Sequence, residues 1–204
     1  MTLVDGRSGA VAASRRPQVL SDLLAGTLVR DAVLVFAGAA LVGLCAQVSV
    51  PLPFTPVPLT LQTFGVLLAG AALGWRRGFA SMLVYGGLGL VGLPWFAGHA
   101  GGTAILGGPL FGYVIAYPVA AALIGWLASR GLDRSPIRTA AMMIVGSIVI
   151  YAGGLPWLMA NVHVGLAKGL HLGVTPFLPG DAIKAVAAAL LLPATWALVN
   201  RDRS

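Results

Sequence analysis

Long apolar stretches, separated by short polar or glycine- and proline-rich segments, dominate the chain. Since about 20 apolar residues span the hydrocarbon core of a bilayer, the pattern indicates six candidate membrane helices, some short enough to require kinks or re-entrant ends. They cover residues 32–50, 59–74, 78–93, 109–129, 139–160 and 182–199. The pattern therefore predicts an all-α membrane protein, built as a compact bundle of six transmembrane helices.

The six spans form a single membrane domain over residues 28–200. Residues 1–27 place arginines among small and polar side chains, without the apolar core and cleavage site of a signal peptide. We expect this segment to be a disordered cytoplasmic tail. Residues 201–204 form a short cytoplasmic C-terminus in the same interpretation.

Composition supports the membrane assignment, because 58% of residues are hydrophobic and only 9% are charged. Soluble domains carry roughly 25% charged residues. A net charge of +7 could attract nucleic acid, but the basic residues stand in short groups between apolar stretches. That distribution is typical of membrane topology, so we expect a lipid bilayer and no nucleic acid as a partner.

Eleven of the thirteen Lys and Arg residues lie on one side of the predicted membrane. They precede the first span, connect the second span to the third, connect the fourth to the fifth, or follow the sixth. Only Lys168 and Lys184 fall on the other side. By the positive-inside rule, both termini are cytoplasmic and the protein crosses the inner (cytoplasmic) membrane several times. The acids follow the same division, which leaves Asp181 as the one acid on the outer side.

Asp181 and Lys184 open the sixth span and are the most informative charges in the chain. An ionisable group inside a membrane costs roughly 2.5 to 3.5 kcal/mol even by mild insertion scales, so this pair predicts a ligand site. Lys184 and free N–H groups at a helix N-terminus attract a carboxylate, and Asp181 accepts from N–H donors. The alternative is an N-terminal Asp cap with a Lys snorkelling beside it at i+3.

We expect two outer connections to form walls or lids of an outward-facing cavity. Residues 51–58 are proline-rich and cannot be helical. Residues 98–109 are glycine-rich and include Gly101 and Thr103, where a ligand can approach the backbone. Thr60, Gln62 and Thr63 follow the proline loop and either line the cavity or satisfy backbone groups at a broken helix.

Aromatic residues gather on the outer half of the predicted bundle. An interfacial belt explains several of them. Tyr113 and Tyr117 differ, being four residues apart on one helix face, where they either flank a ligand ring or hydrogen-bond to a neighbouring helix. The cluster comprises Phe54, Tyr85, Trp95, Phe96, Tyr113, Tyr117, Tyr151, Trp157 and Phe177.

The sequence offers little for catalysis. The three histidines match no metal-ligand spacing, Glu is absent, and the single cysteine, Cys45, lies inside an apolar stretch. We therefore expect no enzyme activity, no metal and no cofactor. Ala39 and Gly43 form a small-xxx-small face on the first span, suited to close approach by a helix of the bundle or of a separate subunit.

Several motifs together resemble the BioY family, the biotin-specific S components of energy-coupling factor (ECF) transporters. They are residues 53–63 (PFTPVPLTLQT), residues 92–98 (GLPWFAG), Gly108-Pro109 with Gly112-Tyr113, and residues 179–184 (PGDAIK). The chain departs from the family at Leu110 and Phe111, where a Thr-Gly pair is usual. Asp181 and Lys184 match the family's polar binding positions.

The resemblance implies a six-helix S-component fold in a bacterial membrane, with a high-affinity outward-facing biotin pocket. It also implies partners, namely a transmembrane coupling subunit and two ABC-type ATPases, which we expect to dock through Ala39 and Gly43. No Walker motif is present in this chain to power transport. The alternatives are an S component for another small vitamin and, in a different class, a membrane enzyme using Asp181 as a base.

Biotin suits the candidate residues. Its ureido ring offers two N–H donors and a carbonyl, its thiophane ring needs an apolar aromatic wall, and its valerate is an anion. We assign Asp181 to the ureido ring, the aromatic cluster to the thiophane, and Lys184 with the helix N-terminus to the valerate. Gly101, Thr103, Thr60, Gln62 and Tyr85 complete the predicted pocket.

Overall fold

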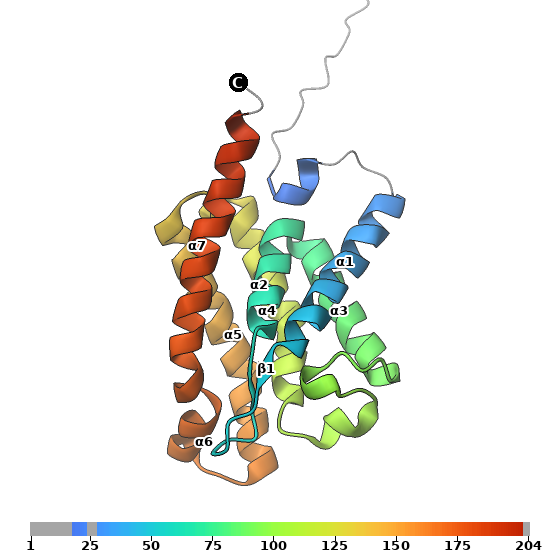
Figure 1. Ribbon diagram of the computed structural model, residues 1–204, viewed down its shortest axis with the longest axis vertical. Coiled ribbons are helices and arrows are strands. Elements are labelled where there is room, and N and C mark those ends of the chain that lie inside the picture. Colours follow the sequence, from blue (N-terminus) through green and yellow to red (C-terminus); the bar gives the residue numbers. More distant parts are fainter. Residues whose placement is uncertain (1–17, 24–27, 202–204) are drawn as a thin grey trace, which may run out of the picture.

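Residues 18–23 and 28–201 are described by the computed structural model, and most of them are helical. Six long helices run roughly along the long axis of the molecule, and the short α6 (Leu166–Gly173) lies at one end (Figure 1). The six, within the described part of the chain, are α1 (Leu28–Gln47), α2 (Gln62–Leu73), α3 (Trp75–Val91), α4 (Phe111–Ser129), α5 (Pro136–Val162) and α7 (Leu178–Arg201).

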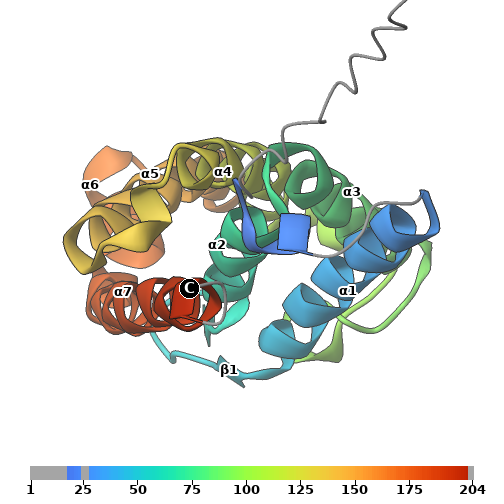
Figure 2. The ribbon, with the colours of Figure 1, turned by 90° about the horizontal axis from the view of Figure 1, so that it is seen from above.

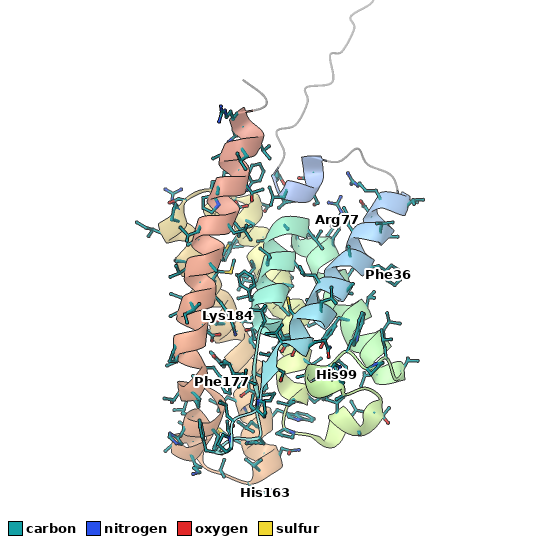
Figure 3. The ribbon with its side chains drawn as sticks, in the orientation of Figure 1. Phe36, Arg77, His99, His163, Phe177 and Lys184 are labelled. Atoms are coloured by element: carbon teal, nitrogen blue, oxygen red, sulfur yellow. The ribbon has the colours of Figure 1, made fainter. Side chains whose placement is uncertain are left out.

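The outer surface of the bundle is apolar, as expected of helices that face lipid. Phe36 is 56% exposed, Ile148 59% and Leu190 67%, on α1, α5 and α7 respectively, and Phe36 points away from the bundle (Figure 3). Four described segments are long and apolar enough to cross a membrane: Leu28–Gln47, Phe111–Ser129, Pro136–Val162 and Leu166–Arg201. The predicted all-α membrane fold is confirmed.

The second predicted span is shorter than its sequence range. The range 59–74 opens with β2 (Leu59–Thr60), which pairs antiparallel with β1 (Ser49–Val50), and α2 begins only at Gln62. At a rise of 1.5 Å per residue, α2 covers about 18 Å, less than the roughly 30 Å hydrocarbon core. The proline-rich loop explains the difference, since it cannot extend a helix and returns the chain as a hairpin instead.

Helix α4 contacts α2, α3 and α5, and seen from above it lies between α5 and α3 (Figure 2). Helix α1 packs on α2 and α3, and α7 packs on α5. The contact between α2 and α4 is backbone to backbone, because a Cβ added at Gly70 would lie 2.5 Å from the carbonyl oxygen of Ala121. Small residues thus allow α2 and α4 to approach closely.

Arginines gather at the end of the bundle where α2 meets α3, α4 meets α5 and α7 ends; we call it the arginine end. The opposite end, which carries α6 and the β1–β2 loop, is the loop end (Figure 1). Arg77 marks the first end and His163 the second (Figure 3). The charge division predicted from the sequence thus separates the two ends of the fold.

The N-terminal segment differs from the expected disordered tail where it is described. Residues 18–23 include a short 3-10 helix, η1 (Leu20–Leu23), and Val19 is only 4% exposed. The Ser21 hydroxyl donates to the carbonyl oxygen of Leu73 (3.3 Å), and Arg77 donates to Ser21 (2.7 Å) and pairs with Asp22 (3.6 Å). These contacts hold the segment on the α2–α3 junction; residues 1–17 and 24–27 lie outside the described range.

A buried polar contact ties α7 to the α4–α5 connection at the arginine end. Asp133, in η4 (Leu132–Arg134), is fully buried and accepts a hydrogen bond from Nε1 of Trp196 on α7 (2.5 Å). Burial raises the pKa of the Asp133 carboxyl, and the Trp196 hydrogen bond partly opposes that shift. This contact fixes the end of α7 opposite to Asp181 and Lys184.

Candidate functional site

A cavity of about 340 Å³ lies in the loop-end half of the bundle. Its walls come from the β1–β2 loop, the start of α2, the glycine-rich segment before α4, and the facing sides of α4, α5 and α7. Of two lining residues labelled in Figure 3, Phe177 lies toward this end and Lys184 near the middle of the molecule. The volume and the mainly apolar wall are typical of a site for a small organic molecule.

The strongest polar feature of the cavity is the pair formed by Asp181 and Lys184. Nζ of Lys184 lies 3.1 Å from Oδ1 of Asp181, and the side chains are only 15% and 13% exposed. The ammonium also donates to Oγ1 of Thr63 on α2 (2.8 Å), and the Tyr151 hydroxyl on α5 donates to Oδ2 of Asp181. Three helices therefore contribute to one hydrogen-bonded network on the cavity wall.

Local sequence explains why these charges meet there. Helix α7 starts at Leu178, directly after the 3-10 turn η5 (Thr175–Phe177), so that Asp181 falls in its first turn. A carboxylate at this point interacts favourably with the helix dipole. Lys184 follows at i+3 and shares its face. The predicted meeting of the two side chains is thus observed, and their role in ligand binding stays a prediction.

A second polar group enters the cavity from α2. Gln62 lines the cavity, is 5% exposed, and donates from Nε2 to the hydroxyl of Tyr85 on α3 (2.6 Å). Tyr85 itself is completely buried and is absent from the lining. The expected direct contact between Tyr85 and a ligand is therefore corrected, because the ring packs behind the wall between Trp95 (5.3 Å) and Phe96 (5.4 Å, edge-on).

Aromatic rings form much of the apolar wall. Tyr113 and Tyr117 both line the cavity from α4, opposite apolar residues of other elements that include Phe96 and Phe177. The Tyr113 hydroxyl donates to the carbonyl oxygen of Gly173 (3.0 Å), which fixes its ring near the end of α6. This wall offers a flat apolar surface to a ligand ring.

The glycine-rich segment closes another side of the cavity. Gly101 lines it, as predicted, but Thr103 does not; Ala104 and Ile105 take its place. Thr103 begins the 3-10 turn η3 (Thr103–Gly107), which presents the next two side chains to the cavity. The segment is held by a hydrogen bond from Nε1 of Trp157 to the carbonyl oxygen of Gly108 (2.9 Å).

The proline-rich loop covers the cavity from the remaining side. Pro56 and Val57 line it, as does Thr60 where the chain re-enters the bundle. Oγ1 of Thr55 donates to the carbonyl oxygen of Leu172 in α6 (2.7 Å). The loop is thereby attached to α6, and the expectation that it forms a wall of the cavity is confirmed.

The sequence placed Tyr151 and Thr63 near the cavity but did not predict that they hydrogen-bond to the ion pair. Tyr151 belongs to the outer aromatic cluster, and Thr63 stands next to Gln62 at the start of the second span. Both signals were therefore present. Only the rotation of α5 and α2 about their axes, which the sequence does not specify, shows that the two side chains face Asp181 and Lys184.

The small-residue face of α1 is part of the bundle interior. Ala39 is completely buried, and a Cβ added at Gly43 would lie 2.7 Å from Cε3 of Trp95. The expectation that Ala39 and Gly43 form a docking surface for a partner subunit is wrong for this structure. Of the two alternatives, close packing within the bundle is the one observed, because α1 lies on α3 and the Trp95 segment through this face.

Comparison with known proteins gives consistent results. The model of the BioY family matches residues 14–201. A probable biotin transporter BioY of Pyrococcus horikoshii is 42% identical over 162 residues, covering 79% of this chain and 93% of its own. The biotin transporter BioY of Rhizobium etli is 39% identical over 172 residues, covering 79% and 90%.

Among solved structures, the S-component for biotin from an ECF-type ABC transporter has a similar fold. Its crystal structure superposes with a TM-score of 0.75 at 29% sequence identity, covering 85% of this chain and 95% of that one. The similarity therefore extends over most of this chain and nearly all of the other.

Proposed function

The chain belongs to the BioY family, and on that premise we propose that it is the biotin-binding S component of an ECF transporter. Its cavity then captures biotin for uptake across the membrane. The family consists of transporter subunits, so the pocket binds its ligand without transforming it. An S component for another small vitamin is the alternative that the test below distinguishes.

The observation that carries this proposal is the Asp181–Lys184 pair inside an otherwise apolar cavity. The two groups lie 3.1 Å apart, so they present an acceptor and a donor side by side. A cyclic urea carries an N–H directly beside its carbonyl and complements such a pair with one hydrogen bond to each group. Both partners of the pair then serve the ureido end of biotin.

This division differs from the one expected from sequence, in which Lys184 met the valerate. Because the ammonium already neutralises Asp181 and also donates to Thr63, it offers little net attraction for a second carboxylate. We place the valerate toward the mouth of the cavity, beside the glycine-rich segment. There the carboxylate keeps hydrating water and can approach backbone N–H groups.

The apolar wall suits the remainder of the ligand. Tyr113, Tyr117 and Phe96 provide ring surfaces for the thiophane and the alkyl chain, whose burial contributes about 25 cal/mol per Å² of apolar area. Polar contacts at one end and apolar contacts along the rest orient the molecule. This arrangement selects a ligand with a polar ring head and a hydrocarbon tail.

Orientation and partners complete the proposal. The arginine end faces the cytoplasm of a bacterial cell, both termini lie there, and the cavity opens on the outer side of the inner membrane. A transmembrane coupling subunit and two ABC-type ATPases supply the energy for uptake. The relative of known structure is itself described as part of an ECF-type ABC transporter.

The proposal is tested by identifying what the protein carries. The protein is purified in detergent after expression in cells supplied with a mixture of vitamins, then heat-denatured, and the released small molecules are identified by mass spectrometry. We expect biotin at close to one molecule per chain. Release of a different vitamin in that amount, with no biotin, would contradict the assignment.

A further inference from the structure

Tyr85 contacts no part of the cavity, yet it is joined to a residue that does. Its hydroxyl accepts a hydrogen bond from Nε2 of Gln62 at 2.6 Å, shorter than most amide–hydroxyl contacts. The tyrosine ring is completely buried and is held by the rings of Trp95 and Phe96. A rigid buried group thus lies directly behind the Gln62 amide.

The direction of this hydrogen bond is set by its next partner. The Tyr85 hydroxyl lies 3.4 Å from the backbone carbonyl oxygen of Trp95, which can only accept. Because the hydroxyl has one proton and donates it there, it accepts from Gln62. The Gln62 amide therefore turns its nitrogen toward Tyr85 and its oxygen away.

The freed oxygen opens on the cavity. Within the described part of the chain, the buried side-chain atoms without a hydrogen-bond partner are Oε1 of Gln47 and Oδ1 of Asp133. Oε1 of Gln62 has no hydrogen-bond partner among the described residues, and yet it is not one of these buried atoms. The oxygen is therefore accessible. Since Gln62 lines the cavity, this oxygen is an acceptor that a ligand can reach.

Gln62 directly precedes Thr63, the residue of α2 to which Lys184 donates, and both residues line the cavity. The cavity wall therefore offers an acceptor at Asp181, a donor at Lys184 and an acceptor at Gln62. The polar edge of a cyclic urea carries two N–H groups and one C=O, which need two acceptors and one donor. Both N–H groups of such a ring find acceptors.

We propose that Tyr85 is a positioning residue that fixes the Gln62 amide, so that Gln62 accepts from the second N–H group of the ureido ring. The inference rests on the proposed function, since it takes biotin as the ligand. Without the Tyr85 hydroxyl, the amide is free to rotate by 180° and to present its NH₂ group to an N–H of the ligand. The pocket then loses a hydrogen bond and gains a donor–donor conflict.

The test is a double-mutant cycle on biotin affinity, measured by calorimetry on purified protein freed of bound ligand. Tyr85→Phe removes the hydroxyl and keeps the ring, and Gln62→Met removes the amide at similar volume. We expect Tyr85→Phe to weaken binding by about 3- to 10-fold in the wild-type background. In the Gln62→Met background it should change affinity by less than about 2-fold, because its effect passes through the amide.

Ser81→Ala serves as the matched control, since Ser81 is a completely buried hydroxyl on the same helix that donates to its own backbone at Arg77. It should leave biotin affinity unchanged. An equal loss from Tyr85→Phe in both backgrounds, or no loss in either, would overturn the positioning role. Failure of the wild-type protein to bind biotin would instead overturn the proposed function, so the two outcomes are distinguishable.

Discussion

The hydroxyl of Tyr151 donates a hydrogen bond to Asp181 across the contact between α5 and α7, on the carboxylate oxygen that Lys184 leaves free. Both oxygens of Asp181 are thereby engaged, one by an ammonium and one by a phenol. A carboxylate held in this way keeps one orientation, and its remaining lone pairs are presented to the cavity.

Tyr151→Phe should therefore weaken biotin binding by about 3- to 10-fold without unfolding the protein, because it removes one hydrogen bond that orients Asp181. Calorimetry with biotin measures the change. Thr139→Val is a matched control on the same helix, since Thr139 is a buried hydroxyl at the arginine end that donates to the backbone at Ser135. If Tyr151→Phe has the affinity of the wild type, Asp181 needs no such support.

Close packing of α4 against α5 supports the aromatic wall. A Cβ added at Gly154 would overlap the ring of Tyr113, whereas a Cβ added at Gly87 on α3 meets nothing within 4 Å. Gly154→Ala should lower thermal stability, as overpacking costs about 1 to 3 kcal/mol, and should weaken biotin binding by displacing Tyr113. Gly87→Ala should be neutral or slightly stabilising. Equal melting temperatures for the two variants would show that α4 and α5 can move apart to accommodate the added methyl group at little cost in stability.

Because Ala39 is buried, a larger side chain at this position should affect the stability of the bundle. Ala39→Leu is expected to destabilise the bundle by about 1 to 3 kcal/mol, because the larger side chain has no space between α1 and its neighbours. The adjacent Ala40 is exposed, so Ala40→Leu should leave the melting temperature unchanged. Thermal unfolding in detergent compares the two. A stable Ala39→Leu variant that loses only its association with a coupling subunit would restore the docking role for this face.

The ion pair also makes a prediction for stability alone. Lys184→Gln leaves Asp181 buried without its counter-charge, which should cost roughly 3 kcal/mol, and Asp181→Asn should cost a similar amount. The double variant removes both charges and should recover much of that loss, since no unpaired charge remains. Melting temperatures of the three variants decide this. A double variant that loses the sum of both single effects would show that the two side chains are energetically independent.

Much of this architecture follows from the sequence, because hydropathy and the distribution of arginines require neither packing nor neighbours. The spacing of Asp181 and Lys184 likewise predicts their meeting, since residues three apart share a helix face. The sequence does not predict which side of each helix faces the cavity. Tyr85 and Tyr151 are both tyrosines in apolar helices, and only the packed bundle shows that the first lies behind the cavity wall and the second on it.

The same limit explains the error at Ala39 and Gly43. In a membrane, lipid-facing and helix-facing surfaces are both apolar, so a small-residue face indicates close approach without indicating by which helix. The short helix α6 escaped prediction for a related reason: it is only eight residues long and falls between two spans. Contacts such as that of Thr55 with Leu172 join segments more than a hundred residues apart and leave no local pattern.

The measurement that tests the central claim most directly is the affinity for biotin of Asp181→Asn, Lys184→Gln and the double variant, determined by calorimetry beside the wild type. If the pair binds the ureido group, each single variant should lose at least about 10-fold in affinity. The double variant, even where its stability is restored, should not regain binding. Wild-type affinity in all three would show that Asp181 is only a helix cap with Lys184 as its partner, and that biotin is recognised elsewhere.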